Sequence, residues 1–110
     1  MAFMYLINKD GEIEERELRY IKQKLHYSGR GYVDVYEAIT KNGSRSEVCV
    51  FPDAYGKIRD KMSVVTKEQD AKLAFSILEK RLEGLLQQLD RKRNKYRKIL
   101  KKLKALQNQD

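Results

Sequence analysis

The segment Thr66–Gln107 reads TKEQDAKLAFSILEKRLEGLLQQLDRKRNKYRKILKKLKALQ. Its apolar residues recur at alternating steps of four and three over about five heptads, which is typical of a helix that packs along another helix. The a positions are Phe75, Leu82, Leu89, Tyr96 and Leu103, and the d positions are Ala71, Leu78, Leu85, Lys92, Ile99 and Leu106. We predict one helix from Thr66 to Gln107, with Thr66 and Gln69 spaced as a capping box.

The apolar stripe of this helix is narrow, and such a stripe cannot hold a lone helix in water. We find no second long helical pattern, so we expect pairing with another copy of the chain rather than with another protein. The expected interface residues are Phe75, Leu78, Leu82, Leu85, Leu89, Tyr96, Ile99, Leu103 and Leu106. The e and g residues leave helix orientation and oligomer number open. Leu73 and Ile77 lie on a second face, which we expect to pack on a sheet.

Positive charge is concentrated in the distal half of the predicted helix. The chain has 24 Lys and Arg against 16 Asp and Glu, and nine of these cations lie within residues 91–104, where no acid occurs. Outside that segment 15 cations face 16 acids. The nine are Arg91, Lys92, Arg93, Lys95, Arg97, Lys98, Lys101, Lys102 and Lys104. Exposed helices ordinarily mix signs to gain i, i+4 pairs, so this pattern favours a polyanion ligand over a merely solvated surface.

Residues 1–65 are predicted to form a small β-rich head domain, and residues 66–110 a separate helical unit. Asp10-Gly11 and Asn42-Gly43 are turn pairs that tolerate the positive φ of tight hairpins. They separate strands expected at residues 3–8, 12–19, 32–40 and 46–51. A helix over residues 14–26 competes with the second strand, and residues 20–27 remain unassigned.

The fourth predicted strand ends at Pro52, which has no amide hydrogen to donate. Asp53 can then cap a short helix that carries Tyr55, Ile58 and Met62 on one side. The expected fold is therefore α+β, with a small antiparallel sheet of about four strands, a short helix and a long C-terminal coiled-coil helix.

No residue pattern points to catalysis, a metal or a cofactor. His26 is the single histidine, and Cys49, the single cysteine, lies between two valines with no basic neighbour. Neither residue forms part of a spacing that binds metal or activates a nucleophile. Residues 28–31 (SGRG) lack the Lys-Ser/Thr ending of a phosphate-binding loop and are read as a connection. Arg30 with Tyr27, Tyr32 and Tyr36 offers an alternative set for base stacking.

Together these patterns predict a non-enzymatic, oligomeric regulatory protein whose basic coiled-coil helix binds DNA or RNA with little sequence preference. The alternative is an adaptor or inhibitor, for example of a host or defence enzyme, that docks on an acidic protein surface. Membrane binding is disfavoured because the apolar stripe is narrow. No apolar run approaches the roughly 20 residues of a membrane span, and no signal-peptide pattern precedes residue 10, so a cytoplasmic location is expected.

Overall fold

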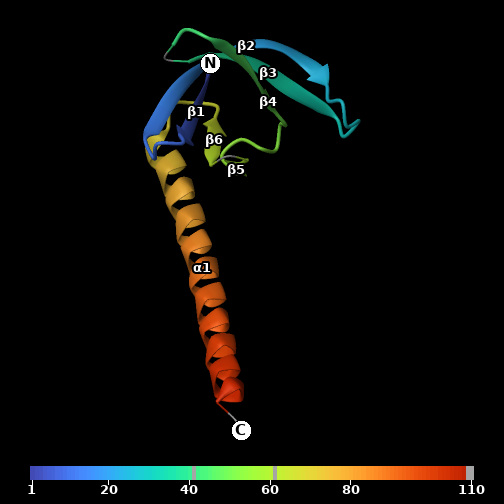
Figure 1. Cartoon of the computed structure of the whole chain (residues 1–110). Helices are drawn as coiled ribbons and strands as arrows, with labels where there is room; N and C mark the ends of the chain where they lie inside the picture. The colour runs from blue at the N-terminus through green and yellow to red at the C-terminus, as the bar shows by residue number, and fades with distance from the viewer. Residues whose placement is uncertain (41, 61, 109–110) are drawn as a thin grey trace. The chain divides into compact units, whose positions relative to one another are not determined.

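The computed structural model describes residues 1–40, 42–60 and 62–108. It is an α+β fold with a six-stranded antiparallel sheet, curled into a half-barrel, and one helix (Figure 1). The elements are β1 (Ala2–Ile7), β2 (Ile13–Leu25), β3 (Tyr32–Ile39), β4 (Arg45–Val50), β5 (Ile58–Arg59), β6 (Ser63–Thr66) and α1 (Ala71–Gln107). The chain forms two compact units, Met1–Glu79 and Lys80–Asp110, so the first turns of α1 belong to the unit that contains the sheet.

The sheet has the strand order β4-β3-β2-β1-β6-β5. The prediction of about four strands is thus confirmed as antiparallel β structure but is wrong in number, because β5 forms where the short helix was expected and β6 forms between that segment and the rest of the predicted long helix. The first predicted hairpin is confirmed. Asn8 Oδ1 accepts hydrogen bonds from the amides of Asp10 and Glu12 at 3.0 and 2.9 Å, and Gly11 has a φ of 81°.

The segment left open by the sequence, residues 20–27, continues β2 as far as Leu25. The pairing of β2 with β3 shifts between Tyr20 and Lys22, a β-bulge that places Ile21 outside the regular register. The competing helix over residues 14–26 is therefore wrong. Backbone pairing with both β1 and β3 outweighs the helical spacing of the apolar side chains in this strand.

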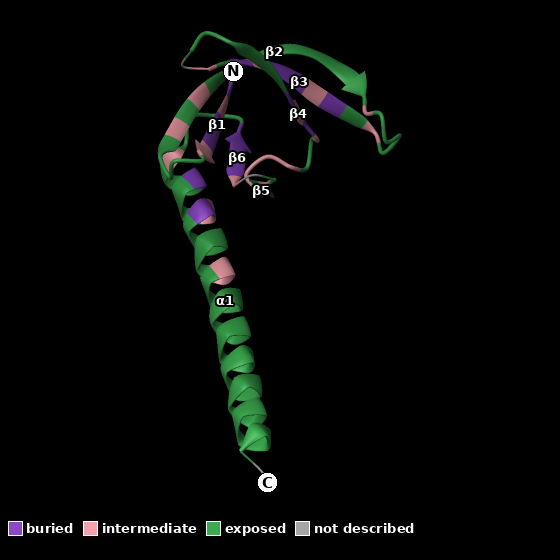
Figure 2. Ribbon diagram, in the orientation of Figure 1, coloured by how far each residue is buried: buried purple, intermediate pink, exposed green. Residues whose placement is uncertain are grey.

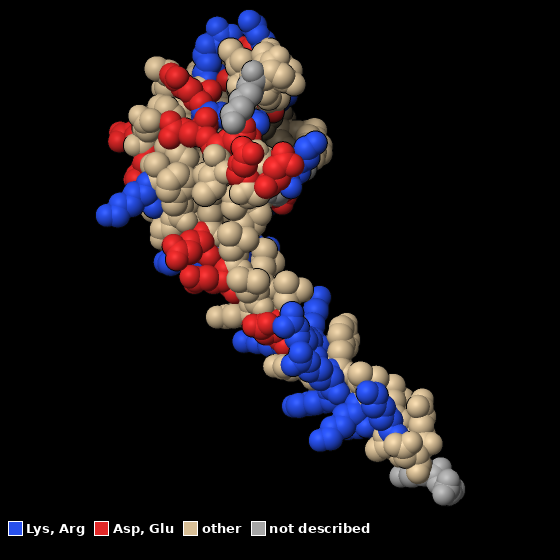
Figure 3. Space-filling model, turned by 60° about the vertical axis from the view of Figure 1, so that its left-hand side comes forward, with Lys and Arg blue, Asp and Glu red and all other residues tan. Residues whose placement is uncertain are grey.

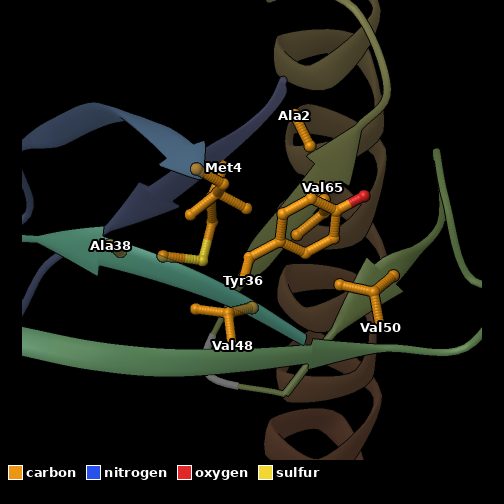
Figure 4. Close-up of a cluster of buried hydrophobic side chains, with 8 residues drawn as sticks. Ala2, Met4, Tyr36, Ala38, Val48, Val50 and Val65 are labelled. Carbon is orange, nitrogen blue, oxygen red and sulfur yellow. The ribbon is translucent and has the colours of Figure 1, made fainter. Parts of the chain in front are cut away.

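The two faces of the sheet carry separate buried clusters. Ala2 and Met4 of β1 pack with side chains of β2, β3, β4 and β6 on one face (Figure 4). Tyr5 of β1 points to the opposite face, as strand alternation requires, and packs with Val64, Ala74 and Leu78. Figure 2 shows that the buried residues of α1 lie only in its first turns. These turns cover the second face of β1 and β6.

The predicted short helix after Asp53 does not form. Residues 52–57 make turns, Gly56 has a φ of 72°, and Ile58–Arg59 pairs with β6 as β5. The Arg59 guanidinium donates to the Cys49 carbonyl of β4 at 2.9 Å. Because β4 and β5 are the two ends of the strand order, this bond joins the two edges of the curled sheet. Burial lowers the pKa of Arg59 from its usual value.

Tyr55 holds the loop between β4 and β5 against the sheet. Its hydroxyl donates to Asp34 Oδ2 at 2.7 Å and lies 2.6 Å from the Tyr36 hydroxyl. Burial, together with the hydrogen bonds to Asp34 and Tyr36, raises the pKa of Tyr55 well above its ordinary 10.0. Tyr55 therefore stays protonated and can donate throughout the ordinary pH range.

Tyr55→Phe is expected to lower the free energy of unfolding by about 2 kcal/mol, since it leaves Asp34 and Tyr36 each without a partner. Urea denaturation followed by circular dichroism measures this difference. Tyr27→Phe is the matched control, because the Tyr27 side chain is 96% exposed, and it should leave the midpoint unchanged. Equal midpoints for the two variants would contradict the stabilising role of the Tyr55 hydroxyl.

The long helix begins at Ala71 rather than at the predicted Thr66. Thr66 is buried in β6, where it pairs with Phe3, so the capping box with Gln69 is wrong. Asp70 caps the helix instead, and its Oδ1 accepts the Leu73 amide at 3.1 Å. The predicted end at Gln107 is confirmed. Of the second face, Ile77 packs on the sheet cluster as predicted, whereas Leu73 is exposed.

Candidate nucleic-acid interface

The nine predicted phosphate-binding cations all lie in one continuous part of α1, and each of these residues is exposed. Figure 3 shows Lys and Arg side chains over much of the visible surface of this part of the helix. At 100° per residue the cations surround the apolar stripe. They are Arg97 and Lys104 at b, Arg91 and Lys98 at c, Lys92 at d, Arg93 at e, Lys101 at f, and Lys95 and Lys102 at g.

None of the nine cations forms an ion pair with another residue in the part of the chain that the structure describes. The ion pairs found there are Arg16–Glu14, Arg19–Glu37 and Arg45–Glu37, and all three belong to the sheet. The acid nearest the cationic segment in sequence is Asp90, which directly precedes it. The positive charge of the distal helix is therefore available to an external anion.

The predicted interface residues divide into two groups. Leu78 is buried against the sheet, and Phe75 makes an edge-to-face ring contact with Tyr5 at 5.8 Å, so both contribute to packing within their own chain. Leu85 is half-buried. The remaining side chains are 43–63% exposed, and they are Leu82, Leu89, Tyr96, Ile99, Leu103 and Leu106. A line of large apolar side chains thus remains accessible from Leu82 onward.

The loop at residues 28–31 has no amide array to cradle a phosphate. The Ser28 amide donates to His26 Nδ1 at 3.2 Å, and the Gly29 amide donates to the His26 carbonyl at 2.9 Å. The Arg30 amide donates to Ser28 Oγ at 3.4 Å. Three successive amides are therefore engaged in the turn itself, which agrees with the reading of this segment as a connection.

The fold does not bring the alternative stacking residues around Arg30 together on one exposed surface. The Arg30 guanidinium lies over the Phe51 ring at 5.9 Å, and Tyr36 is buried in the core. Tyr27 remains exposed beside His26. Cys49 is only partly accessible, and its carbonyl accepts a hydrogen bond from Arg59.

A second exposed surface was not found from the sequence. Tyr20 and Leu25 of β2 and Tyr32 of β3 share the sheet face that carries Tyr36, because Tyr20 pairs with Tyr36 and Leu25 with Tyr32. All three are more than half exposed. We name these three residues the tyrosine face. The sequence shows these aromatic and apolar residues, but their common face can be recognised only once residues 20–25 are assigned as a strand.

A charged hollow of about 530 Å³ lies over β2, β3 and β4. At its wall Glu37 accepts a hydrogen bond from Arg19 at 2.5 Å and pairs with Arg45 at 3.2 Å. The Arg19 hydrogen bond and the nearby Arg45 charge hold the pKa of Glu37 below its ordinary 4.5. No pattern in the sequence pointed to this cluster, because Arg19 and Glu37 come together only through the pairing of β2 with β3.

The lowered pKa of Glu37 predicts a pH-dependent contribution to stability. A carboxyl with a lowered folded-state pKa stabilises the fold above its unfolded pKa, and the contribution is lost as pH falls through the folded value. Wild type should therefore be more stable than Glu37→Gln at pH 7, and the difference should shrink steadily below pH 4.5. Urea midpoints measured from pH 7 downward test this. A constant difference over that range would contradict it.

Among the described residues no group of three or more His, Cys, Asp or Glu side chains is placed to hold a metal ion. In the same residues no helix is long and apolar enough to cross a membrane. Compared with known proteins, the chain matches no protein-family model, no curated protein and no solved structure.

Proposed function

We propose that this protein is a non-enzymatic, self-associating nucleic-acid-binding protein. The observation that carries the proposal is the cationic segment, residues 91–104. It presents nine Lys and Arg side chains on one helix, without an acid in the segment and without an ion pair to any described residue. Nucleic acids supply the matching ligand, a regular line of phosphates with condensed counterions that a cationic surface releases.

Binding is expected to be largely independent of nucleotide sequence. The b, c and f cations point away from the apolar stripe, so they meet a backbone from the outside of the helix. Contacts of Lys and Arg with phosphate position a protein but carry no direct sequence information. The apolar stripe from Leu82 to Leu106 supports the second part of the proposal, the association of copies through their helices.

A binding titration tests this function directly. Fluorescence anisotropy with three labelled 20-bp duplexes of unrelated sequence should give affinities that agree within about threefold, as expected of backbone contacts. Single-stranded DNA and RNA of the same length extend the comparison. Failure to bind any of these probes at 50 mM salt would overturn the proposal.

A protein-binding role is the second candidate, and the tyrosine face supports it. Tyr20, Leu25 and Tyr32 expose aromatic and apolar surface on one sheet face, and Tyr is enriched where proteins meet. A protein that acts as an adaptor or inhibitor would use this face to contact its partner. Replacement of Tyr20 and Tyr32 by Ser should then abolish partner capture without changing nucleic-acid affinity. Loss of nucleic-acid affinity in that variant would instead indicate that the tyrosine face also takes part in nucleic-acid binding.

A further inference from the structure

The arrangement of the distal helix points to a specific partner geometry. We propose that the exposed stripe of α1 pairs with a second copy of this chain in an antiparallel, two-fold symmetric dimer. The two-fold axis crosses the two helices at the level of Asn94, which itself points outward from the f position. This inference rests on the self-association in the proposed function and adds the orientation and register of the two helices. It uses only the part of α1 beyond the residues that pack on the sheet.

The first argument is the matching of core layers. In an antiparallel pair an a residue of one helix faces a d residue of the other. With the two-fold axis at Asn94, Leu82 faces Leu106 of the second copy and Leu85 faces Leu103. Leu89 likewise faces Ile99. Between residues 82 and 106, a stripe of about 36 Å at 1.5 Å per residue, every leucine and isoleucine layer then meets another, and only Tyr96 faces a polar residue, Lys92.

The second argument concerns Lys92, the one polar residue of the stripe. In a parallel dimer Lys92 would face Lys92 of the second copy, which places two like charges in the core. In the proposed register Lys92 faces Tyr96. The aliphatic stem of Lys can then pack on the ring while its ammonium group reaches the ring face or the water beyond it. Leu89, Lys92 and Tyr96 already line one hollow of about 450 Å³ along the helix.

The third argument comes from the two leucines that lie beside the stripe. Leu86 and Leu100 occupy e positions and are 60% and 51% exposed. In an antiparallel pair e faces e, and the proposed register sets Leu86 opposite Leu100 of the second copy. A shift by one heptad in either direction would instead place Arg93 opposite one of these leucines. The register centred on Asn94 is therefore the one that matches both leucines.

The shift toward the N-terminus would also require Phe75 and Leu78 as core residues. The fold already uses both of them, since Leu78 is buried against the sheet and Phe75 contacts Tyr5. The proposed register needs neither residue. Its outermost layer begins at Leu82, one turn beyond Leu78, and α1 ends at Gln107, one residue beyond Leu106.

Charge gives the fourth argument. A parallel pair would bring two complete nine-cation segments side by side. In the antiparallel pair residues 98–104 lie alongside residues 84–90 of the second copy, whose single charged residue is Asp90. Residues 91–97 of the two copies still lie side by side, and this segment carries five cations in each copy: Arg91, Lys92, Arg93, Lys95 and Arg97. A polyanion bound there would relieve their repulsion, so the dimer and its ligand stabilise one another.

Disulfide mapping in the full-length chain tests the register. In a Cys49→Ser background, Leu85→Cys and Leu103→Cys chains are made separately, oxidised alone and as a mixture, and mapped by mass spectrometry of linked peptides. Disulfides form only where Cα atoms lie within about 7 Å. The antiparallel dimer should link position 85 to position 103 in the mixture. Each variant alone should stay unlinked, because identical positions are then about 27 Å apart.

The remaining outcomes separate this inference from the proposed function. Same-position links in each variant alone would show parallel helices and overturn the inference, while leaving self-association intact. A light-scattering mass of two chains without any link would overturn the register. A mass of one chain would overturn both the inference and the proposed self-association. Nucleic-acid titration of the same samples reports on phosphate binding independently of all these results.

Discussion

The triple variant Lys98→Gln, Lys101→Gln, Lys104→Gln should bind a 20-bp duplex roughly 100-fold more weakly than wild type at 0.1 M salt. These three cations occupy the outward c, f and b positions, so they lie clear of the apolar stripe. Each phosphate contact contributes about 0.9 to the slope of log affinity against log salt. Loss of three contacts should therefore make that slope shallower by about 2.7.

The control for this variant removes the same charge elsewhere. Lys9→Gln, Lys24→Gln, Lys72→Gln replaces three exposed lysines outside the cationic segment and lowers the net charge equally. Its affinity should stay within about threefold of wild type, since no positioned phosphate contact is lost. If both triple variants weaken binding equally, overall charge rather than the distal helix accounts for binding, and the assigned interface is wrong.

Leu89→Asn should dissociate the oligomer. Leu89 lies near the middle of the exposed stripe and is 57% exposed in the single chain, so the replacement should leave the fold of that chain intact. Loss of a buried leucine costs about 2 kcal/mol or more per copy. With one such loss in each of two copies, the dissociation constant should rise on the order of 10³-fold. Sedimentation equilibrium over a concentration series measures this change.

Leu73→Asn provides the matched control. Leu73 is an exposed leucine of the same helix, but it lies off the stripe and should leave the molecular mass unchanged. If Leu73→Asn dissociates the oligomer and Leu89→Asn does not, the interface lies on a different face of α1. Circular dichroism of both variants establishes whether either replacement unfolds the helix itself.

The parts of the fold set by local chemistry could be predicted from the sequence. Asp10-Gly11 gives a hairpin because Gly11 readily adopts a positive φ, and the helix end at Gln107 follows from the end of the heptad pattern. The helix start could not be found in the same way. Thr66 has a good local capping pattern, but pairing with Phe3 across β1 and β6 outweighs it.

The segment after Pro52 shows the same conflict between local and tertiary effects. Tyr55, Ile58 and Met62 have helical spacing, yet Tyr55 is fixed by hydrogen bonds to Asp34 and Tyr36, which are distant in sequence. Ile58 pairs with Val64 in a short strand. Contacts of this kind depend on the curl of the whole sheet, which no pattern within ten residues encodes.

The exposure of the cationic segment was easier to predict than the fold around it. Nine cations without local acids cannot be buried without a large desolvation cost, so exposure of residues 91–104 follows from charge alone. The limits of the apolar stripe did not follow. Leu78 fits the heptad pattern as well as Leu82 does, and only the three-dimensional packing assigns Leu78 to the sheet.

The salt dependence of nucleic-acid binding by the wild-type chain tests the central claim most directly. Anisotropy titrations with one labelled 20-bp duplex at 50 mM and 200 mM salt provide the two affinities that are compared. If at least six of the nine cations contact phosphate, affinity should fall about 10³-fold between these conditions. An affinity that is the same at both salt concentrations, or no binding even at 50 mM, would contradict the account of the distal helix as a phosphate-binding surface.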